Sequence, residues 1–77
     1  MLTLQLPQHI QPSGDWARDN ASGRDLAGAL IDAARSNANP CIINAALRGI
    51  AEGGRWSGVE VGFAFALAAA AMTAGAQ

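Results

Sequence analysis

Residues Ser57 to Gly75, S-G-V-E-V-G-F-A-F-A-L-A-A-A-A-M-T-A-G, decide the fold that this sequence predicts. Ser57 and Glu60 have the spacing of a capping box, in which the two side chains bind backbone N–H groups at the start of a helix. Gly75 is a suitable C-terminal stop. The stretch therefore predicts one long helix over residues 57–75.

The large apolar side chains of this helix fall into two sets on roughly opposite faces: Val59, Phe63 and Leu67 on one, and Val61, Phe65 and Met72 on the other. A helix that is apolar on both sides is either buried on both sides or spans a membrane. Glu60 lies inside the stretch and no Lys or Arg cluster flanks it, which disfavours a membrane span. Ala68 to Ala71 form a flat, small-residue surface that lets another helix come close. We expect this helix to be central and to contribute to an oligomer or partner interface.

The composition describes one small domain with few large apolar residues. A chain of 77 residues buries only about 60–65% of its unfolded surface, so close helix packing, an oligomer or a partner must complete the core. The net charge is −1, with no Lys and no basic run, which gives no indication of nucleic-acid binding. One Cys excludes an internal disulfide. The N-terminal residues lack the pattern of a signal peptide, so we expect a cytoplasmic protein.

The segment before the helices is predicted to be irregular. Leu2, Leu4 and Leu6 alternate with polar residues as in a strand. We expect an extended arm that lies over the helices, with pairing to the same arm of a second subunit as the alternative. Residues 8–21 are predicted to be a loop, with room for one helical turn around residues 15–19. Trp16 would pin this loop to the core as a hydrophobic plug, or serve as a partner-binding anchor.

Two further helices are predicted between this loop and the long helix. The first covers about residues 22–37, beginning at a capping-box-like Ser22 and Asp25. Gly28 in its middle marks either a close helix approach or a tolerated surface position. The second covers about residues 39–52, beginning at Asn39-Pro40 and ending at Gly53-Gly54. The predicted core-facing residues of the first helix are Leu26, Leu30, Ala33 and Ala34, with Ile31 at the edge of that face. Those of the second helix are Ile42, Ile43, Ala46, Leu47 and Ile50. A polar line in the second helix contains Arg48 and Glu52, which can pair.

The sequence contains little that suggests catalysis or metal binding. His9 is the only histidine and Cys41 the only cysteine, whereas a structural zinc site needs about four ligands. Cys41 lies in the first turn of a predicted helix, but as a small apolar side chain it is expected to be buried. No phosphate-binding loop and no nucleophile motif occurs. We therefore expect a protein that is not an enzyme and holds no cofactor or metal.

The remaining function class is binding, and the candidate surface combines the second face of the long helix with the neighbouring aromatic residues. The loop before that helix places Arg55 next to Trp56, beside a flexible glycine pair. Helix-mediated contacts use apolar residues at this kind of spacing. The candidate partner-binding residues are Trp16, Arg55, Trp56, Val61, Phe65 and Met72.

Two resemblances extend this interpretation. In size and lack of catalytic motifs, the sequence resembles the small phage-encoded inhibitors of bacterial defence, among them the anti-CRISPR proteins. Arg55-Trp56, followed by Glu60-Val61-Gly62-Phe63 and the run Ala64 to Ala71, is similar to the closing helix of phage sponge proteins that sequester cyclic oligonucleotide signals. Those proteins turn a tyrosine and a lysine towards the ligand, and this sequence has neither. In a protein of this second kind, Arg24 or Arg55 could bind the phosphates instead, although nothing in the sequence pattern requires it.

These observations predict an all-α fold of three helices with an extended N-terminal arm. The predicted function is a non-enzymatic inhibitor that binds a protein partner, directed at a host defence complex and acting in the host cytoplasm if phage-encoded. A homo-oligomer is expected, with no direct contact to nucleic acid and no membrane. The alternatives are a sponge for a cyclic oligonucleotide and a small structural subunit of a homo-oligomer.

Overall fold

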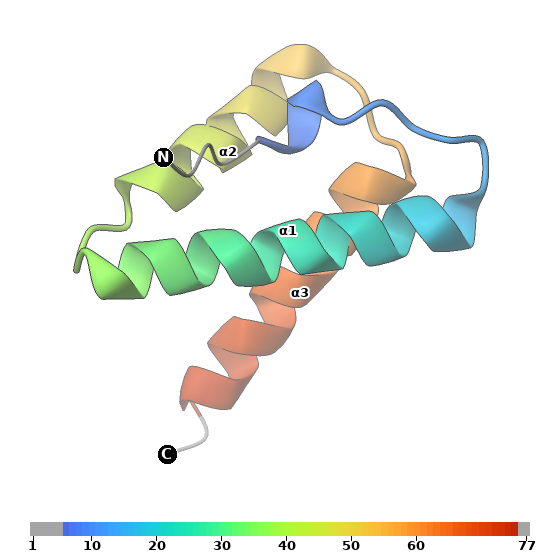
Figure 1. The fold of residues 1–77 in the computed structure, drawn as a ribbon. Coiled ribbons are helices and arrows are strands. Elements are labelled where there is room, and N and C mark those ends of the chain that lie inside the picture. The colour runs from blue at the N-terminus through green and yellow to red at the C-terminus, as the bar shows by residue number, and fades with distance from the viewer. Residues whose placement is uncertain (1–5, 76–77) are drawn as a thin grey trace.

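The computed structural model describes residues 6–75, which form three α-helices preceded by one 3₁₀ turn (Figure 1). The elements are η1 (Pro7–His9), α1 (Trp16–Ser36), α2 (Cys41–Gly53) and α3 (Gly58–Gly75). The described residues contain no strand, which confirms the all-α prediction. The extended arm predicted at residues 2–6 lies outside the described residues except for Leu6, which packs against the core. None of the described helices is long and apolar enough to cross a membrane.

The helices are arranged around the crossing of α1 and α3 (Figure 1). α2 and η1 lie on one side of α1, and the C-terminal end of α3 projects beyond α1 on the other side. The buried core cluster comes from all three helices and consists of Ala27, Leu30, Ala46 and Phe63. Partly buried side chains surround it: Leu6, Leu26, Ile42, Ile43, Ile50, Ala66 and Leu67. The predicted inward face of α3 is confirmed for Val59 and Phe63, which are both fully buried.

A glycine of α1 allows its backbone to touch that of α3. A Cβ atom on Gly23 would overlap the carbonyl group of Val59 and would lie 2.8 Å from the backbone nitrogen of Phe63. Real Cβ atoms essentially never come this close to backbone atoms. Only a residue without a side chain can therefore occupy position 23 in this packing.

Two glycines of α3 make the matching contact in the opposite direction. A Cβ atom on Gly62 would overlap the carbonyl group of Asn20, and one on Gly58 would lie 2.9 Å from the carbonyl oxygen of Trp16. The hydrogen that Gly62 carries in place of Cβ therefore points at the Asn20 carbonyl group, the arrangement of a weak Cα–H···O contact between helices. Of the two alternatives for Gly28, the surface position is confirmed, because Gly28 is exposed and has open space around it. Ala68, Ala69 and Ala71 are exposed, so the helix approach expected at Ala68 to Ala71 does not occur among residues 6–75.

Helix α1 begins at Trp16, six residues before the predicted start at Ser22. The side chain of Asp15 caps it by accepting a hydrogen bond from the Arg18 nitrogen at 3.3 Å. The first turns of α1 pack on α3 through backbone atoms, so they lack the apolar periodicity by which a helix is recognised in a sequence. Ser22 is an exposed mid-helix residue rather than a cap, and much of the predicted loop is helical.

The turn between α1 and α2 is a Schellman motif with an alanine in the position that usually holds glycine. The Asn39 nitrogen donates to the Ala34 carbonyl oxygen at 3.0 Å, and the Ala38 nitrogen donates to that of Arg35 at 3.2 Å. Ala38 adopts a left-handed conformation with φ of 49°. An L-residue with a Cβ atom is strained in this region of the backbone.

Helix α2 begins at Cys41 and ends at Gly53, within two residues of the prediction. The Asn39 side chain accepts a hydrogen bond from the Cys41 nitrogen at 3.0 Å, so Asn39 acts just outside the first turn. Gly54 follows the helix in a left-handed conformation with φ of 71° and confirms the predicted glycine stop. The predicted Arg48–Glu52 pair is present at 3.4 Å and is exposed.

We predict that Gly62→Ala and Gly23→Ala will each lower the free energy of unfolding by about 1–3 kcal/mol, because the added methyl group forces the two backbones apart. Gly28→Ala is the matched control, and it should raise the stability by up to about 1 kcal/mol because alanine is the better helix former. Urea unfolding monitored by circular dichroism measures the free energy of unfolding of all three variants. Equal stability of Gly62→Ala and Gly28→Ala would contradict the glycine crossing.

We also predict that Ala38→Gly will stabilise the protein by about 1 kcal/mol, because glycine adopts the left-handed conformation without a Cβ clash. The same replacement at the exposed helical residue Ala29 should lower the stability by about 1 kcal/mol. Thermal unfolding compares the two variants. A loss of stability at both positions would show that residue 38 is not left-handed in solution.

Candidate protein-binding site

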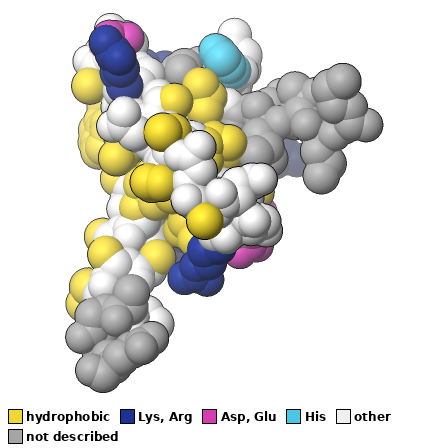
Figure 2. Space-filling view, turned by 90° about the vertical axis from the view of Figure 1, so that its left-hand side faces the viewer, with side chains coloured by type: hydrophobic (Ala, Val, Ile, Leu, Met, Phe, Trp, Pro, Cys, Tyr) yellow, Lys and Arg dark blue, Asp and Glu magenta, His cyan; other side chains and the backbone are white. Residues whose placement is uncertain are grey.

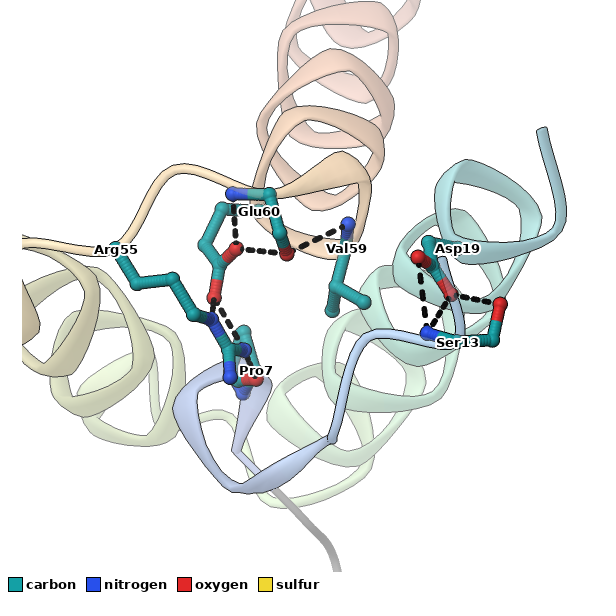
Figure 3. Close-up of polar contacts among 7 residues, drawn as sticks. Pro7, Ser13, Asp19, Arg55, Val59 and Glu60 are labelled. Carbon is teal, nitrogen blue, oxygen red and sulfur yellow. Dashed lines mark hydrogen bonds and ion pairs between the residues drawn. The ribbon is translucent and has the colours of Figure 1, made fainter. Parts of the chain in front are cut away.

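The loop between α2 and α3 is held by a buried carboxylate, that of Glu60 (Figure 3). Glu60 accepts hydrogen bonds from the Ser57 nitrogen at 2.7 Å and from the Nε of Arg55 at 2.8 Å. The Ser57 hydroxyl also donates to Glu60 and accepts a hydrogen bond from the Val59 nitrogen at 3.2 Å. The predicted capping box is thus confirmed, with Arg55 as an additional ion-pair partner.

The same arginine fastens the N-terminal turn to the helices. A terminal nitrogen of Arg55 donates a hydrogen bond to the carbonyl oxygen of Pro7 at 3.0 Å. Pro7 is buried, and its turn therefore cannot leave the core without breaking this contact. We call Pro7, Arg55, Ser57 and Glu60 the Glu60 cluster.

The carboxylate of Glu60 is ionised although it is only 1% exposed. Burial acts to raise the pKa of Glu60, but the hydrogen bonds from Arg55 and Ser57 outweigh that effect and hold the pKa below its ordinary value of 4.5. These donors keep the buried carboxylate ionised at neutral pH. Arg55 is therefore part of the fold, and binding a ligand phosphate through it would require breaking the ion pair.

A second carboxylate holds the segment before α1 (Figure 3). Asp19 is buried, and its side chain accepts hydrogen bonds from the Ser13 nitrogen at 2.9 Å and the Ser13 hydroxyl at 2.8 Å. The backbone hydrogen bond from Ser13 is the main reason that the pKa of Asp19 lies below its ordinary value of 3.8. Gly14 and Arg18 act in the same direction, and burial opposes them. Sequence reasoning missed this contact, because residues 8–21 were predicted to be a loop with at most one helical turn, and the first long helix was expected to begin only at Ser22.

The two tryptophans of the chain lie at the same end of the molecule, where α1 and α3 both begin. Trp16 is the first residue of α1, and its carbonyl oxygen lies against Gly58, two residues after Trp56. Their side chains are 60% and 62% exposed, so Trp16 does not act as the predicted hydrophobic plug. We call Trp16 and Trp56 the tryptophan end.

The backbone on both sides of each exposed tryptophan is fixed. Trp56 lies between Arg55 and Ser57, which both bind Glu60. Trp16 follows the helix cap Asp15 and precedes Asp19, which binds Ser13. The fold therefore holds two large apolar side chains in solvent on an ordered backbone.

The remaining predicted partner-binding residues lie along α3, away from its packing face. Val61 is half-buried, whereas Phe65 and Met72 are 65% and 76% exposed. Among the predicted site residues, Arg55 is the one whose side chain forms hydrogen bonds within the fold, to Glu60 and to Pro7. Leu47 was predicted to lie on the core-facing side of α2, but it is 45% exposed.

The side chains considered for catalysis are not brought together. His9 is exposed at the end of η1, and Cys41 is exposed in the first turn of α2 rather than buried as expected. Among residues 6–75, no group of three or more His, Cys, Asp or Glu side chains is placed to hold a metal ion. The two buried carboxylates have structural roles at helix starts.

Comparisons of this chain with protein-family models, with curated proteins and with solved structures found no match. The functional argument therefore depends on the residues and contacts described above.

The two depressed carboxylate pKa values predict acid-sensitive folding. Their contribution to stability is complete above about pH 5 and is lost as the pH falls through the folded-state values, which lie below 4.5 for Glu60 and 3.8 for Asp19. Glu60→Gln should lower the free energy of unfolding at pH 7 by about 1.5–3 kcal/mol. Because the variant has no carboxylate at this position to protonate, its free energy of unfolding should also fall less between pH 5 and pH 3.

Glu52→Gln is the control for this variant, because the Arg48–Glu52 pair is exposed and should contribute less than about 1 kcal/mol. Urea unfolding at a series of pH values measures both variants. If the two variants had the same stability at pH 7, the Glu60 cluster would not be the structural element that we describe.

Proposed function

We propose that the protein acts by binding another protein, without catalysis, and that the tryptophan end is the centre of the binding surface. The observation that carries this proposal is the exposure of Trp16 and Trp56 on a backbone held by the Asp19 and Glu60 carboxylates. Tryptophan is well buried on average and is enriched among the residues that dominate interface energetics. Both tryptophans of a chain this small are instead left in solvent.

Order in the free protein favours binding. Association is opposed by the entropy lost when flexible side chains and loops become fixed. The loop that carries Trp56 is already bound to α3 and to η1 through Arg55 and Ser57. A partner would therefore need to fix only the two indole rings, which have few rotatable bonds.

The apolar area at the tryptophan end is sufficient for a specific contact. Each tryptophan side chain offers about 150–250 Å², so covering the exposed parts of both removes on the order of 250 Å² from water. At about 25 cal/mol per Å² this corresponds to roughly 6 kcal/mol before the cost of association. We infer a partner with an apolar groove or pocket that accepts aromatic side chains.

The charges near the tryptophan end favour a protein over a polyanion. The starts of α1 and α3, where helix dipoles attract anions, are already occupied by the carboxylates of Asp15 and Glu60. Arg55 is paired with Glu60, and the chain as a whole has a net charge of −1. The narrower expectation, that binding inhibits a host defence complex, stays a prediction.

The experiment is quantitative affinity capture with the intact protein and the double variant Trp16→Ala/Trp56→Ala. We predict that specific partners bound by the intact protein are lost from the double variant, each replacement weakening binding by about 2 kcal/mol or ~30-fold. Leu47→Ala is the control, because Leu47 is an exposed apolar residue on α2. Capture of the same proteins by all three forms would contradict the proposal.

Fluorescence gives a direct second readout, because the chain has two tryptophans and no tyrosine. In the free protein both indoles should be quenched by acrylamide, as expected of solvated rings. Binding of a captured partner should protect them and shift their emission to shorter wavelength. Trp16→Phe and Trp56→Phe assign the signal to one ring or the other. An unchanged spectrum in the complex would place the interface elsewhere.

A further inference from the structure

Exposed apolar side chains are not confined to the tryptophan end. Phe65 and Met72 on α3 are exposed to a similar or greater degree, and Figure 2 shows hydrophobic side chains over one side of the molecule and along its projecting C-terminal end. Trp56 differs from these residues in the backbone that carries it. Phe65, Met72 and Trp16 belong to helices, whereas Trp56 lies between α2 and α3. Contacts other than helical hydrogen bonds must therefore hold Trp56 in place.

The linker between α2 and α3, residues 54–56, has few contacts of its own. Gly54 and Trp56 are exposed, and Arg55 is partly exposed. Within residues 6–75, none of the backbone hydrogen bonds outside the helices involves these three residues. The linker also begins with Gly54, directly after Gly53, and glycine has more conformational freedom than any other residue. Order in the linker therefore depends on a side-chain anchor.

Arg55 supplies this anchor at two points (Figure 3). Its Nε donates a hydrogen bond to a carboxylate oxygen of Glu60 at 2.8 Å, and a terminal nitrogen donates to the carbonyl oxygen of Pro7 at 3.0 Å. The same terminal nitrogen also pairs with the Glu60 carboxylate. Glu60 belongs to α3 and Pro7 belongs to η1, so one guanidinium group joins the linker to both elements.

The Pro7 carbonyl oxygen reaches Arg55 because η1 is formed and docked. This oxygen also accepts a hydrogen bond from the Ile10 nitrogen at 3.2 Å, which closes the 3₁₀ turn. A carbonyl oxygen has two lone pairs and can accept both bonds. The side chain of Pro7 is buried, and η1 packs against α2 and α3. A movement of η1 away from the helices would therefore remove the acceptor from Arg55.

We propose that Arg55 is a positioning residue for Trp56, and that it makes the order of this tryptophan depend on the docking of η1. While η1 is docked, the Arg55 side chain is bound at both Glu60 and Pro7, and the linker is fixed. When η1 is displaced, Arg55 loses the bond to Pro7, and the residue next to Trp56 gains conformational freedom.

Trp16 is held by different contacts. It is the first residue of α1 and follows the helix cap Asp15. Asp19, three residues later, binds Ser13. None of these contacts uses Arg55 or an atom of η1. The tryptophan end therefore combines one tryptophan whose position is set by a helix with a second whose position is set by η1.

This inference rests on the proposed function and adds a means of regulating the binding surface. A partner that contacts both tryptophans binds more weakly when η1 is displaced, because association must then also pay for fixing the linker. Fixing the backbone of one residue corresponds to about tenfold in affinity. The coupling is reciprocal by thermodynamic linkage, so a partner that fixes Trp56 also stabilises the docked state of η1.

Time-resolved fluorescence anisotropy of single-tryptophan chains tests the coupling. The chain has two tryptophans and no tyrosine, so a Trp16→Phe chain reports on Trp56 and a Trp56→Phe chain reports on Trp16. We predict that Pro7→Gly and Arg55→Gln each increase the fast depolarisation of Trp56, which measures local motion on the nanosecond timescale, and leave that of Trp16 unchanged. Arg48→Gln is the matched control, because it removes an arginine from an exposed ion pair on α2 and should change neither signal.

Hydrogen exchange gives the reciprocal measurement at η1. The Ile10 amide closes this turn by donating to the Pro7 carbonyl oxygen. In Arg55→Gln it should exchange about tenfold faster, the factor that corresponds to one hydrogen bond from a charged group. In Arg48→Gln the exchange rate of the same amide should not change.

Unchanged depolarisation of Trp56 in Pro7→Gly would overturn the coupling, and so would an equal increase at Trp16, because general loosening of the fold would then explain the result. Circular dichroism checks the helical content of each variant. If Arg55→Gln does not fold, Pro7→Gly decides, because it leaves the Arg55–Glu60 pair in place. These measurements need no partner, so a negative result would reject the coupling alone, whereas the proposed binding surface is judged separately by affinity capture.

Discussion

The close contact of two helix backbones is the constraint on which the rest of the structure depends. Gly23 on α1 and Gly58 and Gly62 on α3 let each helix approach the carbonyl groups of the other. A chain with so few large apolar residues cannot fill a wide gap between helices. Instead, glycines at the crossing let the two backbones come into contact. Dispersion contacts between backbone atoms then replace the contacts that larger side chains would make.

This crossing fixes the positions of the two polar clusters and of the exposed aromatic residues. Asp19 and Glu60 are each buried in the first turn of their own helix, and each takes its hydrogen-bond donors from the segment that precedes that helix. Asp19 uses Ser13, and Glu60 uses Ser57 and Arg55. These contacts order the segments on which Trp16 and Trp56 are carried. The crossing also uses one face of α3 and leaves Phe65 and Met72 exposed on the other face.

The sequence predicted the features that arise from local chemistry. The capping box of Ser57 and Glu60, the glycine stop at Gly54 and the inward face of Val59 and Phe63 are all present. Each depends on residues within one or two turns of the same helix. The exposed, apolar outer face of α3 was also apparent from the spacing of its large residues.

The sequence could not indicate the features that arise from contacts between distant segments. The early start of α1 was missed, because its first turns pack through backbone atoms and show no apolar period. Among several glycines, nothing local distinguishes Gly23 from Gly28, since only the opposing helix makes the difference. The role of Arg55 was likewise hidden, because its carbonyl partner on Pro7 is far away in the sequence. The most direct test of the account is a solution NMR measurement of cross-relaxation between the Hα atoms of Gly62 and Asn20. The glycine crossing predicts a strong cross-peak; its absence in a protein that retains all three helices would contradict the account.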